Sequence, residues 1–253
     1  MSKMFDAVST FVFDLDGTIY EGNSLLPGSK EMIGYLRDLG YNILFCTNNS
    51  SKTRLEIATK LSKMDIDCSE EDIFSSGWAT SEYVNSTGIS NLWIVGSDSL
   101  VKMLSKSGLA DSPEESDCLI VGFDSNFDYQ RLTYAVRACN HCNYIIYCNE
   151  DRHYRGDGGK IFPGCGGMTY AIRECSEREP DTIIGKPNKY MMSLIMDKMS
   201  LNKNEIVVVG DSYESDIRFA ENAGTSSIMI SDEDRSDVRC VKTLFDLKNF
   251  FKW

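Results

Sequence analysis

The feature that most constrains this chain is an apolar segment that ends in two carboxylates. Residues 11–13 favour a β-strand, and Asp14 and Asp16 follow it before a glycine turn at Gly17. This pattern predicts a buried strand, and in open α/β sheets ligands bind at the carboxyl ends of the strands. Two neighbouring carboxylates repel each other unless a cation or a proton relieves the repulsion. The segment therefore favours a site for a hard divalent cation, Mg²⁺ first, and the alternative is an acidic turn without a ligand.

Strand and helix patterns alternate along the chain, which predicts an α/β fold with a doubly wound, mostly parallel sheet. After the first strand, a helix over 28–39 precedes a strand over 42–46, and Gly40 suits the end of that helix. The polar cluster over 47–51 can cap a following helix over 52–63. The further elements that we expect are a unit near 73–77, strands over 91–95, 118–121, 144–148, 182–185, 205–209 and 227–230, helices over 189–199 and 215–222, and a turn-rich segment over 152–167.

Length and charge narrow the classes of function. A chain of 253 residues can form one large domain or two smaller ones. Its formal net charge of −12 should repel nucleic acid and anionic membranes, so a phosphate ligand would need a local site that overcomes this field. No apolar run reaches the roughly 18 residues that a membrane helix needs. Residues 1–6 lack the apolar core of a signal peptide, and we expect a cytoplasmic protein.

The cysteines suggest reduced thiols. The chain has nine, an odd number, and several stand in strand or helix patterns, which favours buried thiols over a disulfide framework. Cys139 and Cys142 have the C-x-x-C spacing of redox and zinc sites, but only Cys148 and His153 stand near enough in sequence to complete a zinc site. We therefore interpret the pair as structural cysteines at a helix end and keep a functional role as the alternative.

Polar side chains follow four of the predicted strands. Each group alone is typical of a turn, a helix cap or a solvated side chain, yet together they could meet at one edge of the sheet. Phosphoryl transfer needs such a set: a nucleophilic carboxylate, a carboxyl that moves a proton, and cations and donors that hold the phosphoryl charge. Helix N-termini after Thr47 and after Asp211 would add positive dipole ends. The four groups are Asp14 with Asp16, Thr47 with Asn48, Lys186, and Asp211 with Asp216.

This series of motifs resembles the haloacid dehalogenase superfamily of phosphatases. The segments that carry the resemblance are 14–20, 46–50, 185–187 and 210–217. These segments, together with 121–129, 149–151 and 163–166, are similar to the NagD/p-nitrophenylphosphatase-like branch, subfamily IIA, which has a C2-type cap. The resemblance implies a Rossmann-like catalytic core formed by 1–80 and 180–253, with an α/β cap inserted over 81–179.

The resemblance also implies a Mg²⁺-dependent phosphatase that hydrolyses a small-molecule phosphate monoester through an aspartyl-phosphate intermediate. In that mechanism Asp14 is the nucleophile and a metal ligand. Asp16 is the general acid and base, and its backbone carbonyl binds Mg²⁺. Asp211 is the third protein ligand of the metal.

The remaining motif residues would handle the phosphoryl group. The resemblance implies that Thr47 and Asn48 hold it and that Lys186 neutralises its charge. Asp216 would support Lys186 or a metal-bound water. Ser212 departs from the larger polar residue that relatives often carry, which affects the mouth of the site rather than the chemistry.

The substrate stays open at this level. The predicted loops 149–155 and 162–167 of the cap are the candidates for reading the leaving group, through Asn149, His153, Tyr154 and Arg155. The alternative is that these are merely exposed loop residues. Phosphoglycolate, pyridoxal phosphate, nucleoside monophosphates, glycerol phosphate and sugar phosphates all suit the motifs, and a cap-mediated homodimer is expected by analogy.

Other functions are compatible with parts of the pattern. A phospho-receiver domain also combines aspartate, threonine and lysine, but receivers lack the insertion of about a hundred residues between Thr47 and Lys186. A sensor or pseudo-enzyme that binds a phosphorylated ligand is a second alternative, although the set of acidic and basic residues is complete. Asp16 argues against a dehalogenase, and a phosphonatase would need a cap lysine that we do not identify.

Overall fold

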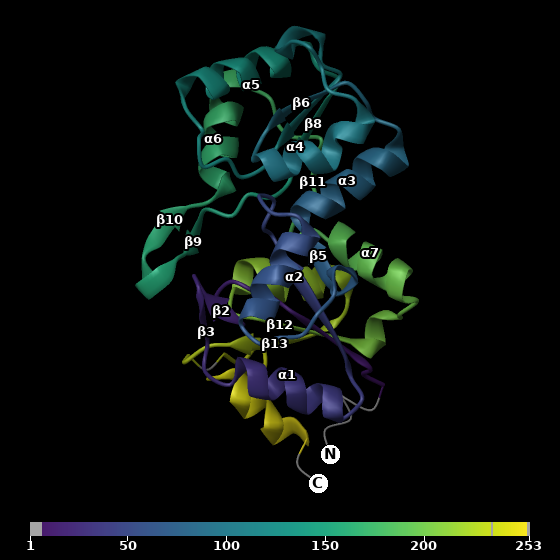
Figure 1. The fold of residues 1–253 in the computed structure, drawn as a ribbon, viewed down its shortest axis with the longest axis vertical. Helices are drawn as coiled ribbons and strands as arrows, with labels where there is room; N and C mark the ends of the chain where they lie inside the picture. The colour runs from purple at the N-terminus through teal and green to yellow at the C-terminus, as the bar shows by residue number, and fades with distance from the viewer. Residues whose placement is uncertain (1–6, 234, 252–253) are drawn as a thin grey trace.

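The computed structural model describes residues 7–233 and 235–251, so the expectation about residues 1–6 lies outside it. The described chain forms two lobes that are stacked along the long axis of the molecule (Figure 1). Each lobe is built on its own parallel sheet with helices around it, and the α/β class predicted from the sequence is confirmed. Within these residues, no helix combines the length and apolar character that crossing a bilayer demands.

The first lobe contains a six-stranded parallel sheet in the order β14-β13-β12-β1-β4-β5. Helices cover both of its faces, because α1, α2 and η8 contribute to one apolar cluster and α3, α7 and α8 to another. Its strands are therefore buried on both sides and nearly continuous in apolar residues. They are β1 (Thr10–Phe13), β4 (Asn42–Thr47), β5 (Ile73–Ser75), β12 (Ile206–Gly210), β13 (Ser226–Ile230) and β14 (Cys240–Val241), and the helices are α1 (Ser29–Asp38), α2 (Arg54–Lys63), α3 (Ser76–Thr87), α7 (Tyr190–Met199), α8 (Arg218–Ala223) and η8 (Leu244–Phe251).

The second lobe contains a four-stranded parallel sheet in the order β11-β8-β7-β6. The apolar cluster between the lobes is shared, since Val12 and Leu44 of the first sheet and Ile120 of the second belong to it. The elements of this lobe are β6 (Leu92–Val95), α4 (Asp98–Leu104), β7 (Cys118–Val121), α5 (Tyr129–His141), β8 (Tyr144–Tyr147), α6 (Cys165–Ser176) and β11 (Thr182–Ile183), with the short turns η3 (Ser105–Ser107) and η4 (Pro113–Glu115). Two further short turns, η2 (Glu70–Asp72) and η6 (Lys203–Glu205), precede β5 and β12 of the first lobe.

One strand lies in a different sheet from the one we expected. We assigned residues 180–253 to the catalytic core, but β11 pairs with β8 at the edge of the second sheet. Lys186, which follows β11, therefore does not extend from a strand of the first sheet. The division into 1–80 with 180–253 and 81–179 otherwise stays a prediction.

The start of α2 also differs from the prediction. The helix begins at Arg54, and its N-cap is Thr53 rather than the 47–51 cluster. Thr53 and Glu56 form a capping box: the Glu56 amide donates to Thr53 Oγ1 at 3.2 Å, and the Thr53 amide donates to Glu56 Oε2 at 2.7 Å. Residues of the 47–51 cluster form hydrogen bonds with one another instead; for example, the Ser51 amide donates to Asn49 Oδ1. The positive end of the α2 dipole is thus several residues away from Thr47.

Two β-hairpins lie beside the main sheets. One is β2 (Tyr20–Glu21) with β3 (Ser24–Leu25), and the other is β9 (His153–Arg155) with β10 (Ile161–Pro163). The second hairpin replaces the predicted turn-rich segment because Tyr154 and Phe162 pair across the strands and stack, with ring centroids 5.5 Å apart. Its tip is the short turn η5 (Asp157–Gly159), and α6 already begins at Cys165, so 162–167 is not a loop.

The C-x-x-C pair lies in the second lobe at the end of α5. Both thiols are buried in the apolar cluster of that lobe, and burial raises the pKa of the Cys139 thiol to about 11. The Arg178 guanidinium donates to the Cys142 carbonyl at 2.9 Å and also to the Cys139 carbonyl, which satisfies the end of the helix. This setting agrees with structural cysteines.

Candidate active site

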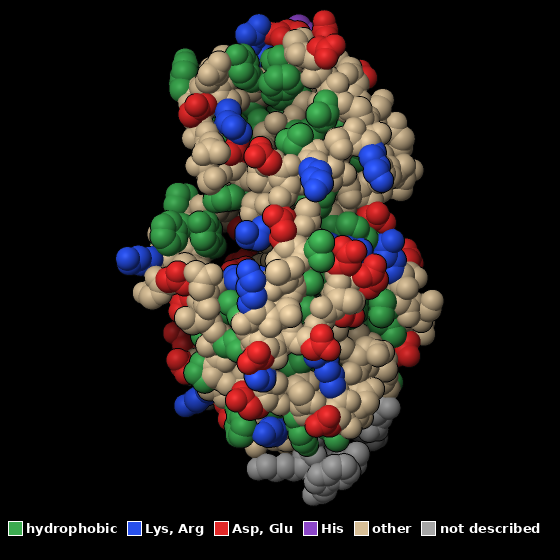
Figure 2. Space-filling model, viewed as in Figure 1, with side chains coloured by type: hydrophobic (Ala, Val, Ile, Leu, Met, Phe, Trp, Pro, Cys, Tyr) green, Lys and Arg blue, Asp and Glu red, His purple; other side chains and the backbone are tan. Residues whose placement is uncertain are grey.

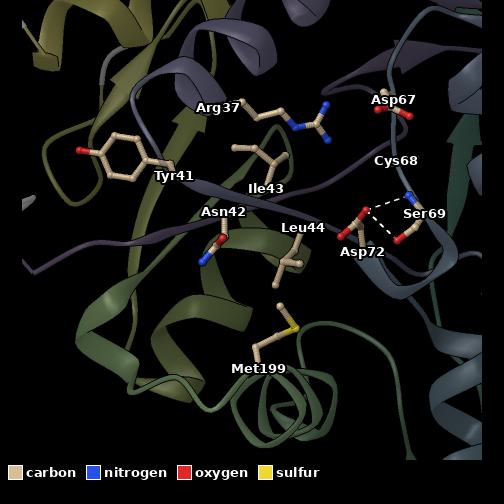
Figure 3. A pocket seen from close by; sticks show the side chains of 10 residues that line it. All are labelled: Arg37, Tyr41, Asn42, Ile43, Leu44, Asp67, Cys68, Ser69, Asp72 and Met199. Atoms are coloured by element: carbon tan, nitrogen blue, oxygen red, sulfur yellow. Dashed lines mark hydrogen bonds between the residues drawn. The ribbon is translucent and has the colours of Figure 1, made fainter.

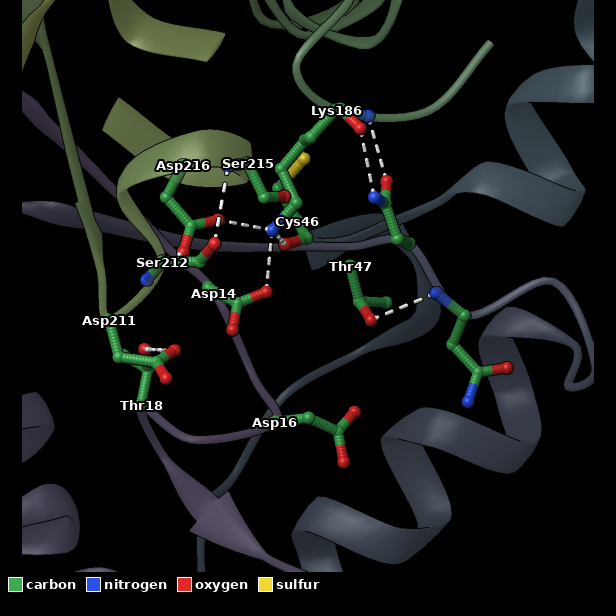
Figure 4. A network of polar contacts seen from close by, with 12 residues as sticks. Asp14, Asp16, Thr18, Cys46, Thr47, Lys186, Asp211, Ser212, Ser215 and Asp216 are labelled. Carbon is green, nitrogen blue, oxygen red and sulfur yellow. Dashed lines mark hydrogen bonds and ion pairs between the residues drawn. The ribbon is translucent and has the colours of Figure 1, made fainter. Parts of the chain in front are cut away.

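The carboxyl edge of the first sheet carries the predicted polar residues (Figure 4). Asp14 follows β1, Thr47 ends β4 and Asp211 follows β12, and these three strands are neighbours in the parallel sheet. The Asp14 amide donates to the Val209 carbonyl at 2.8 Å and extends the ladder between β1 and β12 by one bond. The position of Asp14 at the sheet edge is therefore determined by backbone pairing.

Lys186 reaches this edge from the loop after β11 of the second sheet. Its ammonium Nζ donates to Asp14 Oδ1 at 2.5 Å, to Asp216 Oδ1 at 2.6 Å and to the Cys46 carbonyl at 3.0 Å. Three acceptors match the three hydrogens of a lysine ammonium, and the residue is only 3% exposed. The two carboxylates raise the pKa of Lys186 against the opposing effect of burial. The lysine is therefore held in its charged form.

Asp216 is placed by an unusual turn of the backbone. It lies in a π-helical turn, Tyr213–Ile217, that precedes α8. Its second oxygen, Oδ2, accepts a hydrogen bond from the Ser212 amide at 3.1 Å. A side chain at Gly210 would overlap this carboxylate, so β12 has to end in glycine. Asp216 thus supports Lys186, as the resemblance implied.

Three carboxylates gather at the edge: one oxygen each from Asp14, Asp211 and Asp216 lies within 4.8 Å of the others. Thr18 Oγ1 donates to Asp211 Oδ1 at 3.2 Å, and a Cβ at Gly17 would overlap the Asp211 carboxylate. Burial, followed by the charge of Asp216, raises the pKa of Asp211 to about 6. Burial also raises the pKa of Asp14, although Lys186 opposes the shift. Such a donor set fits a hard divalent cation, whose charge would relieve the repulsion.

Asp16 lies apart from this cluster, although it is only two residues from Asp14 (Figure 4). The Tyr20 hydroxyl donates to Asp16 Oδ2 at 3.4 Å. Lys60 of α2 lies over the Tyr20 ring, with Nζ 3.5 Å from the ring centroid. Burial raises the pKa of Asp16, and the Lys60 charge and the Tyr20 hydrogen bond oppose the shift. A carboxyl with a raised pKa, two residues from the predicted nucleophile, is suited to proton donation.

The side chain of Asn48, a predicted phosphoryl ligand, contacts Asp151 and the Lys186 loop. Its Nδ2 donates to Asp151 Oδ1 at 2.9 Å and to the Lys186 carbonyl at 3.0 Å. Its Oδ1 accepts from the Lys186 amide at 2.7 Å. Both ends of the amide are therefore engaged, and the side chain fixes the Lys186 loop against β4. Thr47, whose Oγ1 accepts from the Asn49 amide at 3.1 Å, keeps its hydroxyl hydrogen for a ligand.

The four cap candidates separate into two groups. Asn149 is buried, and its Nδ2 donates to the Asn48 carbonyl at 2.7 Å, so it joins the lobes instead of reading a leaving group. His153, Tyr154 and Arg155 lie on the exposed hairpin strand β9. Figure 2 shows hydrophobic side chains over this hairpin beside a recess between the lobes.

Sequence reasoning missed three residues of the site, Asp151, Tyr20 and Lys60. Asp151 is the acceptor for Asn48, and burial raises its pKa. It stands in the 149–151 segment that carried the family resemblance, which was a usable signal. Tyr20 likewise stands in the 14–20 segment, whereas Lys60 had no such signal, because its proximity to Tyr20 depends on how α2 packs.

A separate hollow of about 500 Å³ opens at the opposite end of the first sheet (Figure 3). Asn42 at the amino end of β4, together with Arg37, Asp72 and Met199, contributes to its lining. Ligands of open α/β sheets bind at the carboxyl ends of the strands, so this hollow is not the candidate site.

Comparison with known proteins agrees with this geometry. A family model described as haloacid dehalogenase-like hydrolase matches residues 11–110, and a HAD-hydrolase-like model matches 183–242. An acid sugar phosphatase of Staphylococcus aureus is 31% identical over 242 residues, which cover 94% of this chain and 90% of the relative. The chain belongs to the haloacid dehalogenase-like hydrolases. Among these hydrolases it is a phosphatase enzyme.

Other relatives of this haloacid dehalogenase-like hydrolase point to the same branch. The chloroplastic phosphoglycolate phosphatase 1A of Arabidopsis thaliana is 29% identical over 254 residues, which cover 90% of this chain and 70% of the relative. The crystal structure of a 4-nitrophenylphosphatase from Thermotoga maritima superposes with a TM-score of 0.88 at 29% identity, covering 97% of this chain and 98% of that one. The predicted NagD/p-nitrophenylphosphatase branch is confirmed.

Proposed function

We propose that this phosphatase hydrolyses a small-molecule phosphate monoester with Mg²⁺, through an aspartyl-phosphate on Asp14. One observation carries the proposal: Lys186 binds Asp14 and Asp216 together at the sheet edge, while Asp16 lies apart with a raised pKa. Burial raises the pKa of both aspartates, but the Lys186 ammonium at Asp14 favours the carboxylate form that a nucleophile needs, whereas Asp16 lies away from this ammonium and can move the proton.

In the first half-reaction a carboxylate oxygen of Asp14 attacks phosphorus. The new Asp14–phosphorus bond forms as the bond from phosphorus to the leaving oxygen breaks. Asp16 gives its proton to that oxygen, so the leaving group departs as a neutral alcohol. Lys186, held against Asp14, opposes the negative charge that gathers on the phosphoryl oxygens, and the Thr47 hydroxyl donates to one of them.

In the second half-reaction water attacks phosphorus of the aspartyl-phosphate. Asp16, now ionised, takes a proton from the water while the bond between phosphorus and the Asp14 oxygen breaks. Phosphate leaves, and Asp14 and Asp16 return to their starting protonation states. Mg²⁺ held by Asp14, Asp211 and the Asp16 carbonyl would neutralise phosphoryl charge throughout.

The relatives' names support the substrate class. They include phosphoglycolate phosphatases, acid sugar phosphatases and a 4-nitrophenylphosphatase, names that refer to phosphates of small molecules. We therefore propose a small phosphorylated metabolite as the substrate. The cytoplasmic location, the exclusion of nucleic acid as a partner and the homodimer stay predictions.

The decisive experiment compares phosphate release from a panel of small esters by the wild type, Asp14→Asn and the control Asp197→Asn, which changes an exposed aspartate on α7. We expect the wild type and the control to be active with Mg²⁺, chelator to stop both, and Asp14→Asn to be inactive while folded. Full activity of Asp14→Asn would contradict the mechanism. Binding of an ester by the wild type without release would favour the sensor.

A further inference from the structure

The β9–β10 hairpin extends from the second lobe to the first. In Figure 1 it leaves the main body of its lobe and descends beside β2 and β3. All six of its strand residues are exposed, and its contact with its own lobe includes the Tyr154 ring against Phe123, with ring centroids 5.7 Å apart. Its tip, η5, contacts β2 of the first lobe.

The tip is attached to the first lobe by Asp157. The Asn23 amide donates to Asp157 Oδ1 at 2.6 Å, and Asn23 Nδ2 donates to Asp157 Oδ2 at 3.1 Å. Both carboxylate oxygens are thus bound by one residue, across 134 positions of sequence. Both residues are exposed, so water competes for these bonds and the contact can open and close.

The turn that receives Asp157 is shaped for a close approach. Gly22 has a φ of +57°, and a Cβ at this position would overlap Asp157 Oδ1 and lie 2.6 Å from the Asp157 amide nitrogen. A side chain there would push the hairpin tip away. Gly22 therefore leaves room for the Asp157 carboxylate, and the two donors of the next residue, Asn23, bind that carboxylate.

This turn is connected to Asp16. Tyr20, two residues before Gly22, donates to Asp16 through its hydroxyl and carries Lys60 on its ring. Burial lowers the pKa of Lys60, whereas the charges of Asp16 and Asp157 both favour its protonated form. The hairpin tip contacts β2, the strand whose Tyr20 bonds to Asp16, so the tip is on the Asp16 side of the site.

We propose that Asp157 and the Gly22–Asn23 turn form a latch that holds the hairpin over the leaving-group side of the site and thereby limits the size of the substrate. The inference rests on the proposed function, because the proton donor Asp16 has to face the leaving oxygen. A leaving group on that side lies beneath the hairpin while the latch is closed, which also excludes water. Asp157 is a positioning residue in this account, since it does not touch the reacting atoms.

The first test asks whether the latch exists, without using activity. Arg155 and Lys160 flank the tip and are exposed, so trypsin reports on its attachment. We expect Asp157→Ala and Asn23→Ala each to speed cleavage at these sites by about tenfold, and the double variant to add little to either, because one charge-assisted contact is lost in all three. The control Asp111→Ala removes an exposed aspartate of the same lobe and should leave cleavage unchanged.

A third variant, Gly22→Ala, disturbs the latch without removing a hydrogen-bonding group. Gly22→Ala should also speed cleavage, and it should still do so in the Asp157→Ala background, because the added Cβ would overlap the backbone amide at position 157 as well as the carboxylate. Equal cleavage of the wild type and Asp157→Ala would overturn the proposal whether or not the protein is a phosphatase. The Asp14→Asn experiment tests the chemistry separately.

The second test asks what the latch does. We compare kcat/KM for a glycolate-sized ester and for a nucleoside monophosphate in the wild type, Asp157→Ala and Asp111→Ala. Opening the latch should raise kcat/KM for the nucleoside monophosphate relative to kcat/KM for the small ester by about tenfold. The change should be larger in KM than in kcat, since the reacting groups stay in place. A ratio equal to that of Asp111→Ala would overturn the size limit, because a merely structural contact would change both esters alike.

Discussion

Lys186 Nζ lies 2.5 Å from Asp14 Oδ1, although the two residues are 172 positions apart and follow strands of different sheets. The lysine therefore joins the lobes at the point where the nucleophile is proposed to act. It also binds Asp216, so the single positive charge of one ammonium is shared by two buried carboxylates. Stability and chemistry are coupled at this contact.

Replacing Lys186 by Met should destabilise the fold and stop turnover. The substitution keeps the volume of the side chain but leaves Asp14 and Asp216 buried without their cation, a loss of about 3–5 kcal/mol for such sites. Urea denaturation in metal-free buffer measures it. Lys198→Met is the matched control, because the Lys198–Glu82 pair is partly exposed and should contribute less than about 1 kcal/mol. Equal losses in the two variants would contradict the account.

Asp16→Asn should discriminate between esters by their leaving groups. An alkoxide needs a proton as it departs, so kcat/KM for an alkyl phosphate should fall by about 10²–10⁴-fold. The fall should be much smaller for 4-nitrophenyl phosphate, whose phenolate leaves without a proton. Because kcat/KM covers only the steps up to the first irreversible one, the later role of Asp16 as a base does not obscure the comparison. Equal losses for both esters would argue against Asp16 as the acid.

Gly210→Ala should impair the site through Asp216. The added methyl group would overlap the Asp216 carboxylate and displace it from Lys186, and misplacement by about 1 Å can cost on the order of 10²-fold in rate. Steady-state kinetics with thermal unfolding measures both effects. Gly34→Ala is the control: a Cβ there meets no atom within 4 Å, and α1 should gain about 0.5–1 kcal/mol. Normal activity of Gly210→Ala would show that the Asp216 position is not critical.

The capping box of α2 should give stability that depends on pH. The hydrogen bond from the Thr53 amide lowers the pKa of Glu56 below its ordinary value of 4.5. A lowered folded-state pKa means that the stabilisation is complete above pH 4.5 and is lost as the pH falls through the folded pKa. Glu56→Gln should therefore be less stable than the wild type at pH 7, and the difference in urea midpoint should shrink in acid. A difference independent of pH would exclude a role for the charge.

The local sequence predicted much of the fold. Strands such as β1 and β12 were recognisable because a parallel sheet covered on both faces needs continuous apolar segments. The β9–β10 hairpin was missed because its stability depends on a cross-strand stack of Tyr154 and Phe162, which periodicity does not register. The assignment of β11 to the first sheet was also wrong, because a strand of two residues has too little sequence pattern to indicate which sheet it joins.

The sequence by itself determined where Asp14, Thr47 and Asp211 stand, because residues at the ends of buried parallel strands reach the same sheet edge through backbone geometry alone. Only the tertiary structure decided what the other side chains do. Asn48 and Asn149 became links between the lobes because the amide groups found partners more than a hundred residues away. Lys60 contacts Tyr20 through the packing of a helix, and Asp157 contacts Asn23 through the packing of a hairpin. Contacts between distant segments depend on how whole elements pack, which short-range sequence patterns do not encode.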